Sequence, residues 1–199
     1  MEMKAVARGR RGAPLKGEIS ARERILATAV ELFYREGIRA IGVDTVVERS
    51  GVSKTSLYRL FGSKDVLIEA FAGEMDRLFW AWWDRLEDQH AGDPRTLLEA
   101  LLSGIAKRIA HPAFRGCPML NLVTEFPDQT HPGRLVARGN KEEMRARLET
   151  IVARLGVADP RRTASQIALL INGAYVTGLV AESSHLSDDL VDGCKKLLA

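Results

Sequence analysis

The chain contains a short polar helix preceded by a tight glycine turn, and few folds use this combination. Gly51 can adopt the positive φ that a sharp turn requires, and Ser53 can cap the following helix by accepting a bond from one of its free amides. Leu57 and Phe61 are spaced to hold one side of that helix against a core. The remaining positions project outward and carry side chains that suit phosphates and base edges: Lys54, Thr55, Ser56, Tyr58 and Arg59. The pattern is typical of a helix that binds nucleic acid.

Two further helices precede the polar one. Ser20 and Glu23 form a capping box in front of apolar residues at helical spacing, and Gly37 ends that helix. A second short helix is expected from Val43 to Ser50, with Thr45 on its outer side. Three short helices with this turn match the helix-turn-helix plan, in which the second helix of the pair enters the major groove.

Positive charge is concentrated in the same part of the chain. Residues 1–70 hold 13 Lys and Arg against 9 Asp and Glu, whereas the remainder holds 16 against 17. Residues 1–19 place five cations among glycines and a proline, so they cannot bury apolar surface, and we expect a flexible basic arm. The arm is either a solvated tail or an extension that touches DNA.

The residues from Ile25 to Ala70 resemble the amino-terminal domain of the TetR family of bacterial transcriptional repressors. The resemblance rests on an ordered set of positions: Ile25, Leu26, Ala29, Leu32, Phe33, Gly37, Val46, Gly51, Val52, Ser53, Leu57, Tyr58, Phe61, Ser63, Lys64 and Leu67. It implies that Lys54, Thr55, Ser56 and Arg59 approach base edges, and that Tyr58 and Lys64 contact phosphates. We add Thr45 to the expected DNA-binding residues because it lies on the outer side of the second helix.

The rest of the chain is expected to be helical, which gives an all-α fold. Proline and glycine punctuate a long helix from about Lys64 to His90 and further helices from Pro94, Pro118, Pro132, Pro160 and Leu186. Thr130 is the expected cap of the helix that begins near Pro132. Together with the TetR resemblance, this implies a helix-turn-helix DNA-binding domain over residues 20–66 and a helical ligand-binding and dimerisation domain over residues 67–199.

The helix from Pro160 to Ser183 is apolar on more than one side, so it must be buried in a core or in a subunit interface. The TetR resemblance favours the interface, because the family dimerises through its last two long helices. A symmetric dimer would present two recognition helices about one DNA turn apart, and its operator would be a palindrome.

The middle of the body is the expected place for a small-molecule inducer, whose identity the sequence does not give. The resemblance implies a ligand among these helices, and apolar walls with few polar anchors suit a pocket. The expected lining is Phe79, Trp83, Met119, Asn121, Leu122, Phe126, Asn172 and Tyr175. Ordinary core packing is the alternative for each of them.

Enzyme motifs are absent from the sequence. It has no HExxH, no paired Cys-x-x-Cys and no glycine-rich phosphate loop, so we expect neither an enzyme nor a metal site nor a cofactor. Cys117 follows Arg115 at an expected helix start, a setting that can activate a thiol, so a redox-sensing regulator is an alternative. A helical enzyme or interaction module that reuses the amino-terminal domain as a scaffold is another.

The expected location is the cytoplasm. Two distant cysteines, Cys117 and Cys194, give no disulfide framework. The basic start is followed by no apolar segment of the secretory kind, and the run from Ile167 to Ala181 is interrupted by Asn172 and is short for a bilayer. We therefore expect a soluble protein with no membrane partner.

Overall fold

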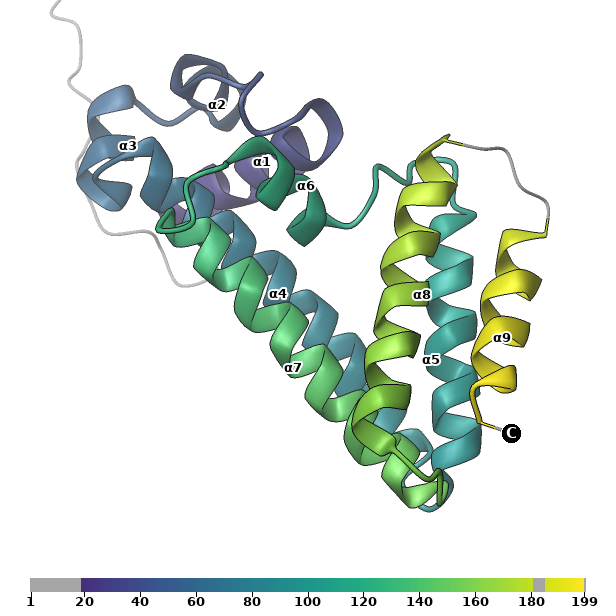
Figure 1. Ribbon diagram of the computed structural model, residues 1–199. Helices are drawn as coiled ribbons and strands as arrows, with labels where there is room; N and C mark the ends of the chain where they lie inside the picture. The colour runs from purple at the N-terminus through teal and green to yellow at the C-terminus, as the bar shows by residue number, and fades with distance from the viewer. Residues whose placement is uncertain (1–18, 181–184, 199) are drawn as a thin grey trace, which may run out of the picture.

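The computed structural model describes residues 19–180 and 185–198, and almost all of the expected basic arm lies outside these ranges. Within them the chain forms nine α-helices and no strand (Figure 1), which confirms the all-α prediction. In chain order they are α1 (Ala21–Glu36), α2 (Val43–Ser50), α3 (Lys54–Phe61), α4 (Lys64–Gln89), α5 (Pro94–Ile109), α6 (Pro118–Glu125), α7 (Pro132–Arg154), α8 (Pro160–Val180) and α9 (Leu186–Lys196).

The first three helices form a small head whose ends are capped as the sequence predicts. Ser20 accepts a bond from the amide of Glu23, whose carboxylate accepts one from the amide of Ser20. Gly51 ends α2 in the left-handed conformation with φ of 63°, and Ser53 caps α3 by accepting from the amide of Ser56. The short turn between α2 and α3 is therefore set by one glycine and one serine.

The long helix α4 runs out of the head and packs along α7 (Figure 1). The predicted domain boundary between residues 66 and 67 falls in the first turn of α4, so a single helix belongs to both parts. At the far end of α4 and α7, helices α5, α8 and α9 stand side by side at an angle to them, and α8 packs on α7. Helix α6 lies between the head and this group.

Two glycines allow helices of the body to approach closely. A Cβ atom at Gly104 of α5 would lie 2.6 Å from the indole ring of Trp82 in α4. A Cβ atom at Gly178 of α8 would overlap the Cγ2 methyl of Ile109 at the end of α5. Both positions therefore need glycine for packing.

The start of α7 at Pro132 is as predicted, but the predicted cap is wrong. Thr130 does not cap α7, because its amide and hydroxyl both donate to the carboxylate of Asp128, at 2.9 and 2.8 Å. The N-cap position is His131, which makes no side-chain capping bond, and Pro132 begins the helix. The Thr130 side chain therefore stabilises a turn with Asp128 and does not cap α7.

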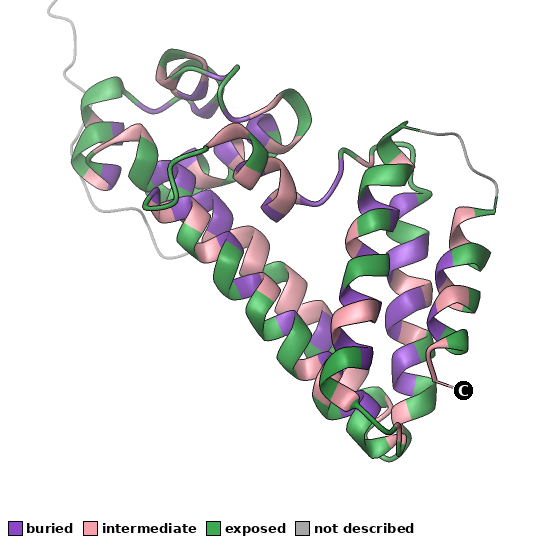
Figure 2. Cartoon of the chain, in the orientation of Figure 1, coloured by how far each residue is buried: buried purple, intermediate pink, exposed green. Residues whose placement is uncertain are grey.

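Helix α8 keeps an apolar surface on its outer side. Its inner residues, including Ile167, Ile171 and Tyr175, are buried against neighbouring helices, whereas Leu169 and Val180 remain 70% and 82% exposed. Figure 2 shows exposed positions along the front of this helix. Within the described part of the chain, only α8 is long and apolar enough to cross a membrane by length and composition, and one such helix is weak evidence for a span.

Candidate DNA-binding surface and ligand pocket

Helix α3 presents a polar surface because two apolar residues fix its rotation. Leu57 is fully buried and Phe61 is 4% exposed, and both belong to the core of the head. Lys54, Thr55, Tyr58 and Arg59 are exposed, and Ser56 is half-buried. This arrangement leaves side chains that can reach phosphates and base edges on one accessible side of the helix.

Two of the predicted DNA-binding residues already have polar partners within the head. The ammonium group of Lys54 lies 2.7 Å from the Asp44 carboxylate of α2, which raises the pKa of Lys54 through the hydrogen bond and the charge. Both groups are exposed, so a phosphate can replace the carboxylate at little cost. Ser56 accepts a 3.0 Å bond from the Ser53 hydroxyl, and Thr45 is half-buried on α2.

Lys64 is directed into the head. Its ammonium group donates to the carbonyl oxygen of Ile38 at 2.9 Å and lies 5.9 Å from the centroid of the Phe33 ring. Burial lowers the pKa of Lys64, and the nearby Glu125 carboxylate opposes this shift. This internal bond competes with the phosphate contact that the sequence predicts for Lys64.

Glu125 at the end of α6 holds the segment between α1 and α2. Its carboxylate accepts bonds from the amides of Ile38 at 3.1 Å and Arg39 at 2.7 Å. The Arg39 guanidinium returns a 3.3 Å bond to the carbonyl oxygen of Glu125. These bonds connect α6 directly to the head.

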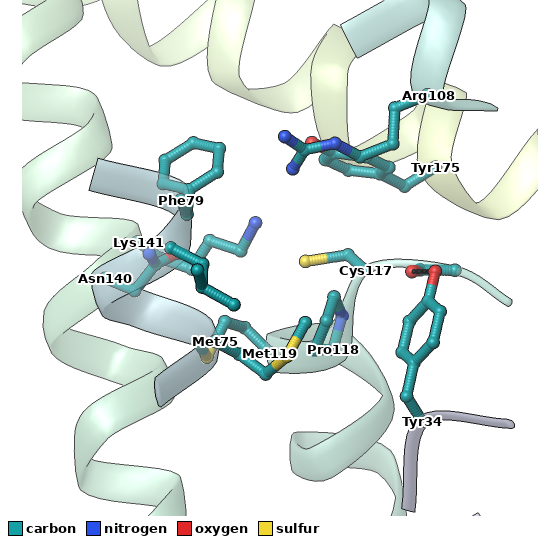
Figure 3. A pocket seen from close by; sticks show the side chains of 12 residues that line it. Tyr34, Met75, Phe79, Arg108, Cys117, Pro118, Met119, Asn140, Lys141 and Tyr175 are labelled. Atoms are coloured by element: carbon teal, nitrogen blue, oxygen red, sulfur yellow. Dashed lines mark hydrogen bonds between the residues drawn. The ribbon is translucent and has the colours of Figure 1, made fainter. Parts of the chain in front are cut away.

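The body contains a cavity of about 230 Å³ whose walls come from α1, α4, α5, α6, α7 and α8 (Figure 3). Its lining is mostly apolar, with a few polar groups, as in many ligand sites. The residues are Tyr34, Met75, Leu78, Phe79, Arg108, Gly116, Cys117, Pro118, Met119, Asn140, Lys141 and Tyr175.

Tyr34 connects this cavity to the head, because it lines the cavity from α1. Its hydroxyl donates to the carbonyl oxygen of Gly116 at 3.2 Å and accepts from the amide of Arg115 at 3.1 Å. The Arg115 side chain donates in turn to the carbonyl oxygen of Arg35. The segment that leads into α6 is thus bonded to the end of α1.

Three of the eight predicted ligand-binding residues line the cavity, namely Phe79, Met119 and Tyr175. Asn172 does not line the cavity itself, but its side-chain oxygen accepts a 3.0 Å bond from the ammonium of the lining residue Lys141. Burial raises the pKa of Tyr175, so its hydroxyl stays protonated at neutral pH.

The other four predicted residues do not line it. Trp83 and Leu122 are fully buried in the core. Asn121 donates to the carbonyl oxygen of Arg115 at 2.7 Å, so it holds the segment before α6. Phe126 stacks on His131 with ring centroids 4.4 Å apart.

Several residues that line the cavity were not predicted from the sequence, above all Arg108 and Lys141. Each lies on an amphipathic helix among ordinary surface charges, and nothing in its local spacing distinguishes it from them. Cys117 lies at the N-cap of α6 and is 7% exposed. Cys194 is fully buried in α9, and burial raises the pKa of its thiol to about 11.

Comparisons with known proteins agree with this architecture. The family described as bacterial regulatory proteins, tetR family, matches residues 25–71. A TetR-family transcriptional regulator from Streptomyces coelicolor has a similar structure, with a TM-score of 0.85 and 29% identity over 89% of this chain and 94% of that chain. A protein from Streptomyces avermitilis described as a TetR transcriptional regulator has a TM-score of 0.74 and 31% identity over 89% of this chain and 99% of that one.

A relative from another bacterium is similar over most of its length. The HTH-type transcriptional regulator YjdC from Escherichia coli (strain K12) is 23% identical over 162 residues, which are 81% of this chain and 85% of that protein.

Proposed function

Because the chain belongs to the tetR family of bacterial regulatory proteins, we propose that it is a homodimeric repressor that a small-molecule inducer releases from a palindromic operator. Membership makes it a transcriptional regulator with a DNA-binding helix-turn-helix. The relatives are transcriptional regulators, which favours this role over a helical enzyme or a scaffold module. The observation that carries the proposal is the exposed polar surface of α3, fixed by buried Leu57 and Phe61.

In this proposal residues 20–66 act as the DNA-binding unit, and α3 enters the major groove. Arg59, Lys54, Thr55 and Ser56 approach base edges, while Tyr58 binds a phosphate. Thr45 of α2 lies close to the DNA backbone. Lys64 is retained as a phosphate contact, although its bond to Ile38 gives it a competing role in positioning the head.

Residues 67–199 serve dimerisation and ligand binding. The outer side of α8 carries Leu169, Gly173, Val176 and Val180 at intervals of three or four residues, and all four are exposed. A second copy of α8, together with α9, would cover this apolar stripe. The resulting two-fold dimer presents two α3 helices with a separation of roughly 34 to 36 Å, or a multiple of it, which matches a palindromic operator.

Ligand in the cavity would change the position of the head. Tyr34 and the segment that begins α6 form part of the cavity wall, and Glu125 at the other end of α6 bonds to the head. A ligand that fits better when these elements move apart shifts the population toward a state in which the α3 spacing no longer matches the groove. The size of the effect is limited by the difference in affinity for the two states.

The proposal is tested by selecting bound DNA from a pool of random duplexes with the purified protein. The expected product is an inverted repeat bound by two chains, measured by sedimentation of the complex. Placed upstream of a reporter gene, the selected sequence should lower expression in cells that make the protein. Enrichment of no sequence, or of one half-site bound by a single chain, would contradict the proposal, and increased expression would make the protein an activator.

A second candidate function uses Cys117, because its thiol faces the same cavity as Arg108 and Lys141 (Figure 3). The thiolate would attack a peroxide oxygen and break the O–O bond, giving a sulfenic acid and releasing hydroxide or an alkoxide that water protonates. DNA release by peroxide in the wild type, but not in Cys117→Ser, supports redox sensing. Equal release from both proteins, or release from neither, excludes it.

A further inference from the structure

The ligand cavity contains two cations and no carboxylate in its described lining. Arg108 approaches from α5 and Lys141 from α7, and both side chains reach the space between Phe79, Tyr175 and Cys117 (Figure 3). The other lining residues are apolar, sulfur-containing or neutral polar groups. The cavity therefore carries a local positive charge inside a largely apolar wall.

Lys141 is held by a neutral partner. Among the described residues its ammonium bonds to the side-chain oxygen of Asn172 at 3.0 Å, and it lies 5.5 Å from the centroid of the Tyr175 ring. An amide oxygen and an aromatic face orient an ammonium without neutralising it. The charge of Lys141 is thus left for a ligand to balance.

Arg108 is positioned by aromatic rings. Its guanidinium carbon lies 4.9 Å from the centroid of the Trp82 ring and 5.9 Å from that of Phe79. No carboxylate of the described residues lies within 4 Å of its nitrogens, whereas Arg147 on α7 meets three of them. Stacking restricts the guanidinium, and its planar set of donors matches a carboxylate.

The carboxylate of Asp76 beside this cavity is held by neutral donors, which leave its charge in place, so it can offset at most one of the two cations. Asp76 of α4 accepts 2.9 Å bonds through one oxygen from Trp80 Nε1 and from Asn140 Nδ2. Asn140 uses one of its two Nδ2 hydrogens on Asp76, so its second N–H and its carbonyl oxygen remain for a ligand. Asp76 therefore orients the wall of the cavity and is not itself part of the described lining.

We propose that the cavity binds a small organic anion, a carboxylate carried on an apolar body, with Arg108 and Lys141 as its charged anchors. This inference rests on the proposed function of the cavity as the inducer site and specifies the chemical class of the inducer. The apolar body would lie against Met75, Phe79 and Met119. A charge that enters such a site finds opposite charge and hydrogen-bond donors, which offset the cost of its desolvation.

The volume limits the size of this ligand. At about 230 Å³ the cavity is smaller than the roughly 300 to 1,000 Å³ that is usual for drug-sized ligands. We therefore expect a ligand about the size of an aromatic acid with one ring or a short-chain fatty acid.

The test compares acids with primary amides of the same skeleton: benzoate with benzamide, phenylacetate with phenylacetamide, and hexanoate with hexanamide. Binding to the full-length protein is measured by calorimetry and by fluorescence of the tryptophans beside the cavity. At least one acid should bind about tenfold or more tighter than its amide, as expected when a charged hydrogen bond is lost. Arg108→Gln and Lys141→Gln should each remove most of this preference.

The matched controls are Lys107→Gln, next to Arg108 on α5, and Arg145→Gln on α7, which remove one exposed charge each and should retain the preference. Thermal unfolding verifies that all four variants are folded. Equal binding of acids and amides, no binding of any acid, or an acid preference that survives in both Arg108→Gln and Lys141→Gln would overturn the anion assignment.

A parallel measurement of DNA binding separates this inference from the proposed function. If an acid binds through Arg108 and Lys141 and leaves the DNA complex intact, the anion site stands and the inducer role fails. If a neutral compound releases DNA with equal potency from the wild type and from both cavity variants, the inducer role stands and the anion assignment fails.

Discussion

The bonds between Glu125 and the head make a strong test of how the two parts of the molecule are connected. Glu125→Ala removes the acceptor of two amides, those of Ile38 and Arg39, while the bond from the Arg39 guanidinium to the carbonyl oxygen of residue 125 can remain. A bond to a charged group contributes roughly 1.5 to 3 kcal/mol. Arg39 is exposed and water can replace its lost partner, whereas Ile38 is 1% exposed.

We therefore count mainly the Ile38 bond, and expect Glu125→Ala to lower the free energy of unfolding by about 2 to 3 kcal/mol. Glu125→Gln retains one amide acceptor without charge and should lose about 1 kcal/mol. The measurement is denaturant unfolding, combined with hydrogen exchange of peptides that cover residues 37–42. Exchange should accelerate there first, because the anchor of that segment is lost.

The control is Glu99→Ala, which removes an exposed carboxylate of α5 that has no hydrogen bond or ion pair to another described residue. It should unfold within about 0.5 kcal/mol of the wild type. If Glu125→Ala has the same free energy of unfolding as this control and residues 38 and 39 exchange at the wild-type rate, the bonds of Glu125 do not stabilise the head.

Five further predictions concern DNA binding, assembly, packing and thiol chemistry. Arg59→Ala should cost roughly 1 to 3 kcal/mol of operator binding and relax base preference at one position of each half-site, as measured by competition with mutated operators; a uniform loss would make Arg59 a phosphate contact. In the same assay, Lys64→Ala should reduce the salt slope by about one if Lys64 binds a phosphate, and should leave the slope unchanged if its role is the bond to Ile38. Val176→Glu places a charge in the apolar stripe of α8 and should give monomers in sedimentation, whereas Arg145→Glu on α7 should not; dimers of Val176→Glu at micromolar concentration would place the interface elsewhere. Gly178→Ala forces a methyl group against Ile109 and should lower stability by about 1 to 3 kcal/mol, while Gly139→Ala on α7, where a Cβ atom meets nothing within 4 Å, should be neutral or stabilising by up to about 1 kcal/mol. The buried Cys194 thiol, with its pKa raised to about 11, stays protonated at pH 8.5 and should resist iodoacetamide in the native protein while reacting in urea; mass spectrometry that finds native Cys194 alkylated would disprove this assignment.

The helices could be predicted because their ends depend on local chemistry. The capping box of Ser20 and Glu23, the turn at Gly51 and the prolines at 94, 118, 132 and 160 act within a few residues of themselves, and each lies where the sequence places it. Thr130 is the exception, because its side chain bonds to the Asp128 carboxylate two residues away and does not cap α7. Local competition of this kind has no signature in helical periodicity.

The cavity was harder to predict because it depends on how distant helices cross. Trp83 and Leu122 are apolar residues of amphipathic helices, and such residues look the same in sequence whether they face a core or a cavity. Arg108 and Lys141 become neighbours of one cavity only through the packing of α5, α7 and α8. Phe79 and Tyr175 were predicted from the aromatic cluster of α4 and from a polar group on α8, and both line the cavity.

The position of Tyr34 has a consequence for protein engineering. This side chain belongs to the amino-terminal unit, yet it forms part of the wall of the cavity in the body. A chimaera that borrows residues 20–66 from a relative also imports that relative's residue at position 34, and with it a different wall. Exchanging heads to redirect such a protein to a new promoter would therefore alter the wall of the cavity proposed to bind the inducer, unless the tyrosine is grafted back.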